Sequence, residues 1–164
     1  MMMGTQPQPP APPRGLKAIP WRLPIWLYRL GLGFLLGERF LLLNHIGRKS
    51  GKVRQAVLEV MLKETDPLAY VVGSGFGERS DWFRNVMHTP EVVIRVGRRR
   101  YRARAARLPH DEALTRFRQY AREHPRALKE LTHLLHYDYD GSEESLETLS
   151  RAIPVVRFQV LGPA

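Results

Sequence analysis

The sequence lacks cysteine, is short of acidic residues and contains no long uninterrupted apolar run. Without cysteine the chain can form neither a disulfide nor a thiolate metal site, and a cytoplasmic location is expected. The most hydrophobic stretch, Trp21 to Leu43, is broken by charges and a proline, and its longest uncharged run is Leu30 to Gly37. Spanning a bilayer takes about 20 apolar residues, so no transmembrane helix is expected.

The charge balance is strongly basic, with 26 Lys plus Arg against 16 Asp plus Glu and a formal net charge of +10. Such a charge attracts nucleic acid, anionic lipid or a phosphorylated small molecule without choosing among them. The densest basic segment contains Arg95, Arg98, Arg99, Arg100, Arg102 and Arg104. Tyr101 should alternate inward with Ala103, which leaves no exposed aromatic for stacking, so nucleic acid is not the expected partner. A solvated strand face, acidic lipid and an anionic cofactor remain open.

Two segments precede the predicted domain. Residues 1–20 are interrupted by Pro7, Pro9, Pro10, Pro12, Pro13 and Pro20. Because they hold few large apolar residues, we predict a disordered tail. Residues 21–38 are predicted to form a hydrophobic, amphipathic helix, since Trp26, Leu30 and Phe34 recur at helical spacing. This helix either packs on the domain or makes a peripheral membrane contact, which would make the protein membrane-associated.

Residues 39–164 are predicted to form one α+β domain. Alternating apolar residues and turn signals predict strands at 40–46, 54–63, 68–74, 92–96, 100–107 and 153–160. Helices are predicted to begin at Ser80 or Asp81 and at His110, Pro125 and Ser142. Six strands with helices inserted late in the sequence favour an antiparallel barrel with peripheral helices.

The turn from Gly47 to Arg54 combines two glycines with a dense set of cations and one hydroxyl. The glycines let backbone amides approach an anion, and Lys49, Ser50 and Arg54 add charge-assisted donors. This composition suits a phosphate, although the spacing is not that of a P-loop and no helix follows. A merely solvated basic hairpin fits the same residues.

A second segment runs from a strand into glycines and then into a helix start, at Val71–Gly77 and Asp81–Asn85. A helix start behind a glycine loop is a good place for an anionic or planar ligand. Glu78 stands where a dinucleotide fingerprint requires glycine, and Ser74 is not centred in a nucleophile elbow. Trp82 and Asn85 lie three residues apart and share one helical face.

Taken together, these segments resemble the deazaflavin-dependent nitroreductase family, whose members use coenzyme F420. The resemblance rests on LLLNHIGRKSGKVRQ, AYVVGSGFGERSDWFRNVMHTPEVVIRVG and RAIPVVRF, and it covers about residues 38–108 and 151–160. It implies a six-stranded split β-barrel of the flavin-reductase, FMN-binding type. It also implies hydride transfer from the deazaflavin to a quinone, a nitroaromatic compound or another conjugated electrophile.

The resemblance implies two groups of cofactor-binding residues. Lys49 and Arg54 would hold the phosphate and the acidic tail of the cofactor, with Arg48 and Ser50 assisting. Gly73, Ser74 and Gly75 would present backbone atoms to the ring system, and Trp82 and Asn85 would line the same groove. Phe76 departs from the family, because many relatives have a polar residue at that place.

Residues 110–150 carry no motif of the family, yet this region should supply the substrate wall and any tyrosine proton donor. The candidate catalytic tyrosines are Tyr120, Tyr137 and Tyr139. His133 and His136 lie near Glu130, but this spacing has no fixed metal signature, and no metal site is expected. Two alternatives stay open: an FMN-dependent oxidoreductase on the same barrel, and a non-catalytic module that binds a cofactor or an anion. The sequence indicates neither the electron acceptor nor the oligomeric state.

Overall fold

The computed structural model describes residues 8–12, 30 and 33–164. The predicted tail and the predicted helix at 21–38 therefore lie mostly outside the described residues and stay predictions. Two parts of them are described. The 3-10 turn η2 (Gly33–Leu36) lies at the end of the predicted helix. Within residues 8–12, Pro9 packs on Gly77, and its carbonyl oxygen accepts a hydrogen bond from Arg79.

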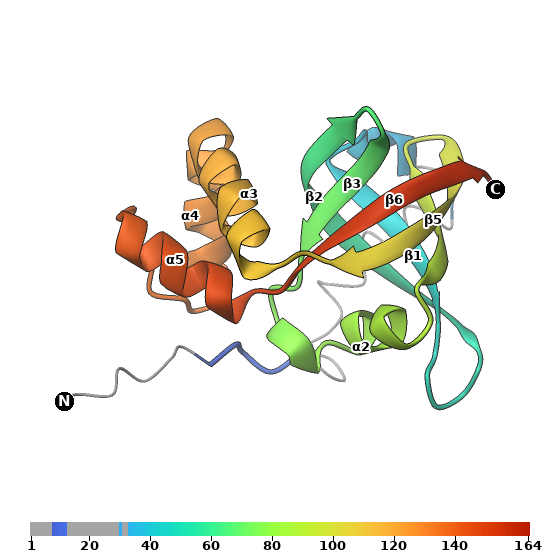
Figure 1. The fold of residues 1–164 in the computed structure, drawn as a ribbon, viewed down its shortest axis with the longest axis horizontal. Coiled ribbons are helices and arrows are strands. Elements are labelled where there is room, and N and C mark those ends of the chain that lie inside the picture. Colours follow the sequence, from blue (N-terminus) through green and yellow to red (C-terminus); the bar gives the residue numbers. More distant parts are fainter. Residues whose placement is uncertain (1–7, 13–29, 31–32) are drawn as a thin grey trace.

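Six antiparallel strands close into a barrel in the order β1-β2-β3-β6-β5-β4 (Figure 1). The strands are β1 (Phe40–Ile46), β2 (Val53–Thr65), β3 (Leu68–Gly73), β4 (Glu91–Val96), β5 (Arg99–Arg107) and β6 (Val155–Pro163). The predicted α+β class and six-stranded antiparallel barrel are confirmed. The main differences are in β2, which is longer at both ends, and in β6, which begins later than predicted.

Strand alternation explains the barrel core. Leu41 and Leu43 of β1 are fully buried, and Ala103 and Ala105 of β5 are buried as well. Arg100, Arg102 and Arg104, the residues that alternate with them on β5, are all exposed. Burying each large apolar side chain stabilises the fold by about 1.5–3 kcal/mol, so the period of two fixes which face turns inward.

The two ends of the barrel differ in what covers them. One end, which we call the α2 end, carries the β1–β2 turn, the end of β3 and the helix α2 (Asp81–His88). The other end carries the β4–β5 hairpin, where Gly97 adopts a φ of 57° that favours glycine. Strand pairing of Leu41 with Val96 and of Tyr101 with Pro163 places the start of β1 and the C-terminus at this hairpin end.

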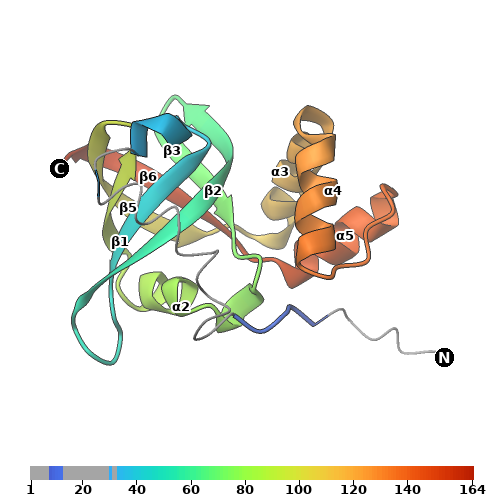
Figure 2. The same cartoon turned by 180° about the vertical axis from the view of Figure 1, so that it is seen from behind.

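Three further helices form a separate layer beside the barrel (Figure 2). They are α3 (His110–Glu123), α4 (Pro125–Leu134) and α5 (Glu143–Ala152). The apolar stripe of α3 was predicted to contain Leu114, Phe117 and Ala121, but its buried residues are Ala113, Phe117 and Tyr120. The stripe is rotated because α3 packs on α5 as well as on β2. No helix in the described part of the chain is long and apolar enough to cross a membrane.

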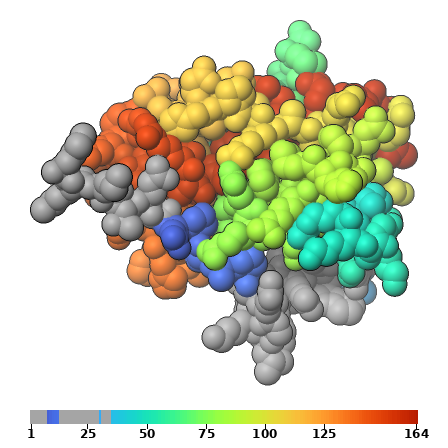
Figure 3. Space-filling model, turned by 60° about the horizontal axis from the view of Figure 1, so that its bottom comes forward, coloured from blue at the N-terminus to red at the C-terminus, as the bar shows by residue number. Residues whose placement is uncertain are grey.

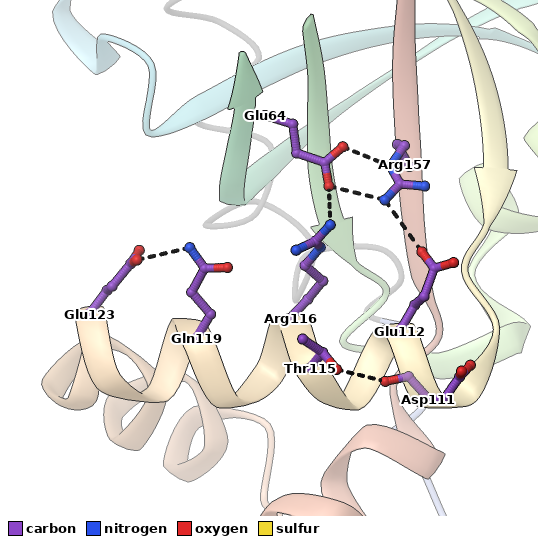
Figure 4. Close-up of polar contacts among 8 residues, drawn as sticks. All are labelled: Glu64, Asp111, Glu112, Thr115, Arg116, Gln119, Glu123 and Arg157. Atoms are coloured by element: carbon purple, nitrogen blue, oxygen red, sulfur yellow. Dashed lines mark hydrogen bonds and ion pairs between the residues drawn. The ribbon is translucent and has the colours of Figure 1, made fainter. Parts of the chain in front are cut away.

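An ion cluster fastens α3 to the barrel (Figure 4). Glu64 of β2 accepts hydrogen bonds from Arg116 of α3 at 2.6 Å and from Arg157 of β6 at 2.8 and 3.0 Å. Arg157 also reaches Glu112 at 3.4 Å. The Glu64, Arg116 and Arg157 side chains are only about a quarter exposed, so the loss of one partner would leave charges poorly solvated. The cluster therefore fixes where α3 sits on β2.

Candidate functional site

The β1–β2 turn is shaped by its two glycines. The backbone N–H of Gly47 donates to Lys52 O, and that of Gly51 donates to Gly47 O, both at 2.8 Å. Gly51 has a φ of 66°, and a Cβ at Gly47 would lie 2.6 Å from Ser50 Oγ. The left-handed backbone at Gly51 favours glycine, and a Cβ at Gly47 would displace the Ser50 hydroxyl from the Lys52 N–H.

The turn presents cations without internal partners. Lys49, Lys52 and Arg54 are exposed, and none of them forms an ion pair with another described residue. Ser50 Oγ accepts a hydrogen bond from the Lys52 backbone N–H at 3.3 Å, which holds the turn closed. Three uncompensated positive charges on one short turn create a local field that attracts an anionic group.

Arg48 joins this turn to α2, and Figure 3 shows the two lying side by side on one face of the molecule. Its backbone N–H and its Nη1 both donate to Asn85 Oδ1 at 3.0 Å. Its guanidinium also donates from two nitrogens to Asp81 Oδ1 at 3.1 Å. The two segments that the sequence singled out are therefore in direct contact, and Arg48, unlike the other cations of the turn, is already paired.

His45 continues this polar chain into the barrel. It follows Leu41 and Leu43 on the inward face of β1 and is buried. Since Asn85 Oδ1 accepts from Arg48, the Asn85 amide nitrogen faces His45 Nδ1, at 3.0 Å, and donates to it. His45 therefore carries its hydrogen on Nε2.

The electrostatic surroundings of His45 favour its neutral form. Burial, followed by the nearby Arg54 charge, lowers the pKa of His45 to about 4, while Asp81 acts in the opposite direction. Sequence reasoning found no role for this residue. The alternation of Leu41, Leu43 and His45 could have placed it on the inward face of the strand.

The glycine-rich loop after β3 is also tied to α2. Ser74 is fully buried; its hydroxyl donates to Gly77 O at 2.7 Å and lies 3.1 Å from Ser80 Oγ. Ser80 directly precedes α2, which was expected to begin at Ser80 or Asp81, and the Ser80 side chain makes no capping hydrogen bond. The hydroxyl instead fastens the loop, so the loop, α2 and the β1–β2 turn form one connected unit.

Side chains from the helical layer pack on the same loop. A Cβ at Gly75 would lie 2.7 Å from Leu135 Cδ1, and one at Gly73 would lie 3.1 Å from Ile153 Cγ2. The Tyr137 hydroxyl donates to Gly75 O at 2.8 Å. These glycines therefore admit close packing of the region 110–153, and Tyr137 is the candidate tyrosine that the described contacts bring to the loop.

Tyr120 lies elsewhere, whereas Tyr139 packs on the same apolar cluster as Tyr137. The Tyr120 hydroxyl donates to Glu59 Oε1 at 3.0 Å, within a cleft of about 860 Å³ between β2 and the α3–α4 corner. Burial raises the pKa of Tyr137 to about 12, and burial, followed by Glu59, raises the pKa of Tyr120 further. Burial also raises the pKa of Tyr139, which is only partly buried. All three hydroxyls therefore keep their proton at neutral pH.

Trp82 lies at the α2 end of the barrel and is partly buried against its core. Its ring meets Phe83 edge to face at 6.1 Å and lies 6.5 Å from Phe158. Such aromatic pairs add about 0.5–1.5 kcal/mol beyond the area they bury. Trp82 therefore forms part of the apolar wall at this end, next to the buried Asn85.

Comparison with known proteins identifies relatives of the chain. The F420H(2)-dependent quinone reductase family model matches residues 29–130. Rv3178 of Mycobacterium tuberculosis, whose name places it among F420H(2)-dependent quinone reductases, is 31% identical over 128 residues, which cover 78% of this chain and 95% of the relative.

Solved structures with the same fold include an F420-H2 dependent reductase, FDR-A, at a TM-score of 0.52 and 20% identity over 75% of this chain and 96% of that one. Another is the protein Atu2129 of Agrobacterium tumefaciens, whose function is unknown, at a TM-score of 0.54 and 15% identity over 93% of this chain and 60% of that one. At these identities the two structures support the barrel fold alone.

Proposed function

Because the chain belongs to the F420H(2)-dependent quinone reductase family, whose cofactor is coenzyme F420, we propose that it passes a hydride from the reduced deazaflavin to a quinone, a nitroaromatic compound or another conjugated electrophile. The family and cofactor expected from the sequence are thereby confirmed. The identity of the acceptor belongs to the proposal. The observation that carries it is the direct contact between the cationic β1–β2 turn and α2.

The cations of the turn fit a cofactor that carries a phosphodiester and several carboxylates. Lys49 and Arg54 would bind these anions, because both are exposed and unpaired among the described residues. Charge-assisted hydrogen bonds of this kind contribute about 1.5–3 kcal/mol each. Arg48 would act by holding the turn in place, since Asp81 and Asn85 already bind its guanidinium.

The ring system would lie against the glycine loop and Trp82. The Ser74 hydroxyl points inward to Gly77 and Ser80, so the loop would offer backbone atoms to a ligand. Both atoms of the Asn85 amide are bonded, to Arg48 and to His45, so Asn85 would position the turn and shape the groove. When bound, the reduced deazaflavin supplies the hydride, while the chain binds it, orients it and excludes water.

Reduction of a quinone or a nitro group also consumes protons, and Tyr137 is the donor that we propose. Its hydroxyl lies 2.8 Å from Gly75 O, on the loop assigned to the ring system. The hydroxyl is protonated at neutral pH, as in any tyrosine, and burial raises its pKa to about 12 and so makes it a weaker acid. The assignment therefore rests on the position of Tyr137 against the loop.

The test is turnover with defined partners. Purified protein is mixed with reduced coenzyme F420 and a quinone, a nitroaromatic compound or no acceptor, and deazaflavin oxidation is followed by absorbance. We expect acceptor-dependent oxidation with the quinone, and a nitroaromatic rate that defines the breadth of the site. Turnover with reduced FMN alone would replace the proposal with the flavin alternative, and binding of F420 without turnover would favour the non-catalytic module.

A further inference from the structure

His45 is a polar side chain at the point where the inward face of β1 reaches the α2 end of the barrel. Leu41 and Leu43, which precede it on this face, are apolar and fully buried, and His45 itself is only 4% exposed. Burying an imidazole costs free energy unless it is hydrogen-bonded, so an apolar side chain would serve the barrel core better at this position. Packing alone therefore does not account for a histidine here.

The imidazole lies next to both segments of the candidate site. Its Nδ1 accepts a hydrogen bond from the Asn85 amide of α2 at 3.0 Å. On the neighbouring strand, the register places His45 directly opposite Arg54, one of the two cations proposed to bind the cofactor. Directly opposed residues of antiparallel strands project from the same face of the sheet. His45 therefore stands between the helix and the cationic turn.

The hydrogen bonds of Asn85 require one orientation of its amide. Oδ1 accepts from the Arg48 backbone N–H and from Arg48 Nη1, both at 3.0 Å. Rotating the amide to exchange its oxygen and nitrogen would turn the NH₂ group toward these two donors and the oxygen toward His45. Because the His45 pKa of about 4 leaves Nδ1 without a proton at neutral pH, that nitrogen accepts from the NH₂ group and opposes the rotation.

We propose that His45 is a positioning residue for the binding of the anionic part of the cofactor. Its Nδ1 holds the Asn85 amide in the orientation that accepts from Arg48. Through Arg48 the amide then holds the β1–β2 turn, so that Lys49 and Arg54 present their charges together. Charges that are already in place bind an anion more tightly than charges on a turn that must first be ordered. The inference rests on the proposed function only where it concerns the cofactor.

Titration with coenzyme F420, followed by tryptophan fluorescence, compares the parent with His45→Leu and His45→Gln. Leucine is similar in size but cannot accept a hydrogen bond, whereas the glutamine side-chain oxygen can. We expect His45→Leu to bind F420 about tenfold more weakly and His45→Gln to stay within about threefold of the parent. With a quinone as acceptor, His45→Leu should raise the KM for F420 far more than it lowers kcat, because His45 acts on the turn. Equal losses of affinity in both variants would overturn the proposal.

Two controls separate this role from a general loss of stability. Leu41→Val changes the core on the same strand, nearer the hairpin end, and should leave the F420 affinity within about twofold of the parent. In a chain that carries Asn85→Ala, His45→Leu should weaken F420 binding no further, because the route through the amide is already lost. A loss in Leu41→Val as large as that in His45→Leu, or a further loss in the Asn85→Ala chain, would overturn the proposal.

Hydrogen exchange followed by NMR tests the contact without the cofactor. The Arg48 backbone N–H donates to Asn85 Oδ1, so its exchange reports whether the amide is held in place. After correction for global stability, this exchange should be about tenfold faster in His45→Leu and parent-like in His45→Gln. Parent-like exchange in His45→Leu would overturn the inference. A parent protein that does not bind F420 would refute the proposed function instead, and the exchange of Arg48 would still decide whether His45 positions the turn.

Discussion

The buried His45 makes the stability of the protein depend on pH in a defined way. In the folded protein the His45 pKa is about 4, against 6.5 for an unperturbed histidine. Between these two values the unfolded chain binds a proton that the folded chain does not. As far as His45 is concerned, the free energy of unfolding should therefore be highest above pH 6.5 and should fall as the pH decreases toward 4.

The size of this effect follows from the two pKa values. A difference of about 2.5 pH units corresponds to about 3 kcal/mol when both states are protonated, since one unit is worth 1.36 kcal/mol. At pH 5 most of the unfolded chains and few of the folded ones carry the proton, so about 2 kcal/mol of stability is already lost relative to neutral pH. That loss is a large share of the total for a domain of this size.

Urea unfolding at a series of pH values between 7.5 and 5 measures the effect. The matched variant is His45→Gln, whose side-chain oxygen can still accept the Asn85 hydrogen bond but which does not titrate. The parent should lose about 2 kcal/mol more than the variant over this range. If the two proteins lose stability in parallel, the assignment of a neutral, buried His45 is wrong, and other groups cause the acid sensitivity.

Three further changes test single contacts of the site. Asn85→Ala removes the partner of both Arg48 and His45, so urea unfolding should show a loss of about 1–3 kcal/mol; a smaller loss would mean that water replaces the amide. Gly75→Ala should lower the free energy of unfolding by about 1–3 kcal/mol, because the added Cβ meets Leu135. In a chain that already carries Leu135→Ala the same change should cost less, and an equal cost in both backgrounds would argue against the clash. Tyr137→Phe should lower kcat for the quinone at least tenfold while the F420 Kd stays within a few-fold, and an unchanged kcat would move the proton donor to another group.

Local patterns predicted the barrel well. Apolar residues alternate with other residues around Leu41 and Leu43, and Ala103 alternates with arginines. Each pattern predicts a strand and shows which of its two faces is buried in the barrel. Gly47 and Gly51 marked a turn, and in the structure Gly51 has a left-handed backbone conformation while a Cβ at Gly47 would meet the Ser50 hydroxyl. These features depend on neighbours in sequence, so the sequence alone contains them.

Contacts between distant segments were not predictable in the same way. Leu135 packs on Gly75, and Ser80 binds Ser74 instead of capping α2, because tertiary packing decides which partner each group finds. The bond from Asn85 to His45 joins residues forty positions apart, and no local period encodes it. The two motifs singled out Arg48 and Asn85 as candidates, whereas their direct contact required the fold.

Binding of coenzyme F420 to the turn cations tests the central claim most directly. Tryptophan fluorescence titration compares the parent with the Lys49→Ala, Arg54→Ala variant and with an Arg122→Ala, Lys129→Ala control of equal charge. We expect the first variant to bind at least about 100-fold more weakly, because each lost charge-assisted bond removes about 1.5 kcal/mol or more, and the control to bind like the parent. Equal affinity of all three proteins would contradict a cofactor site at the β1–β2 turn.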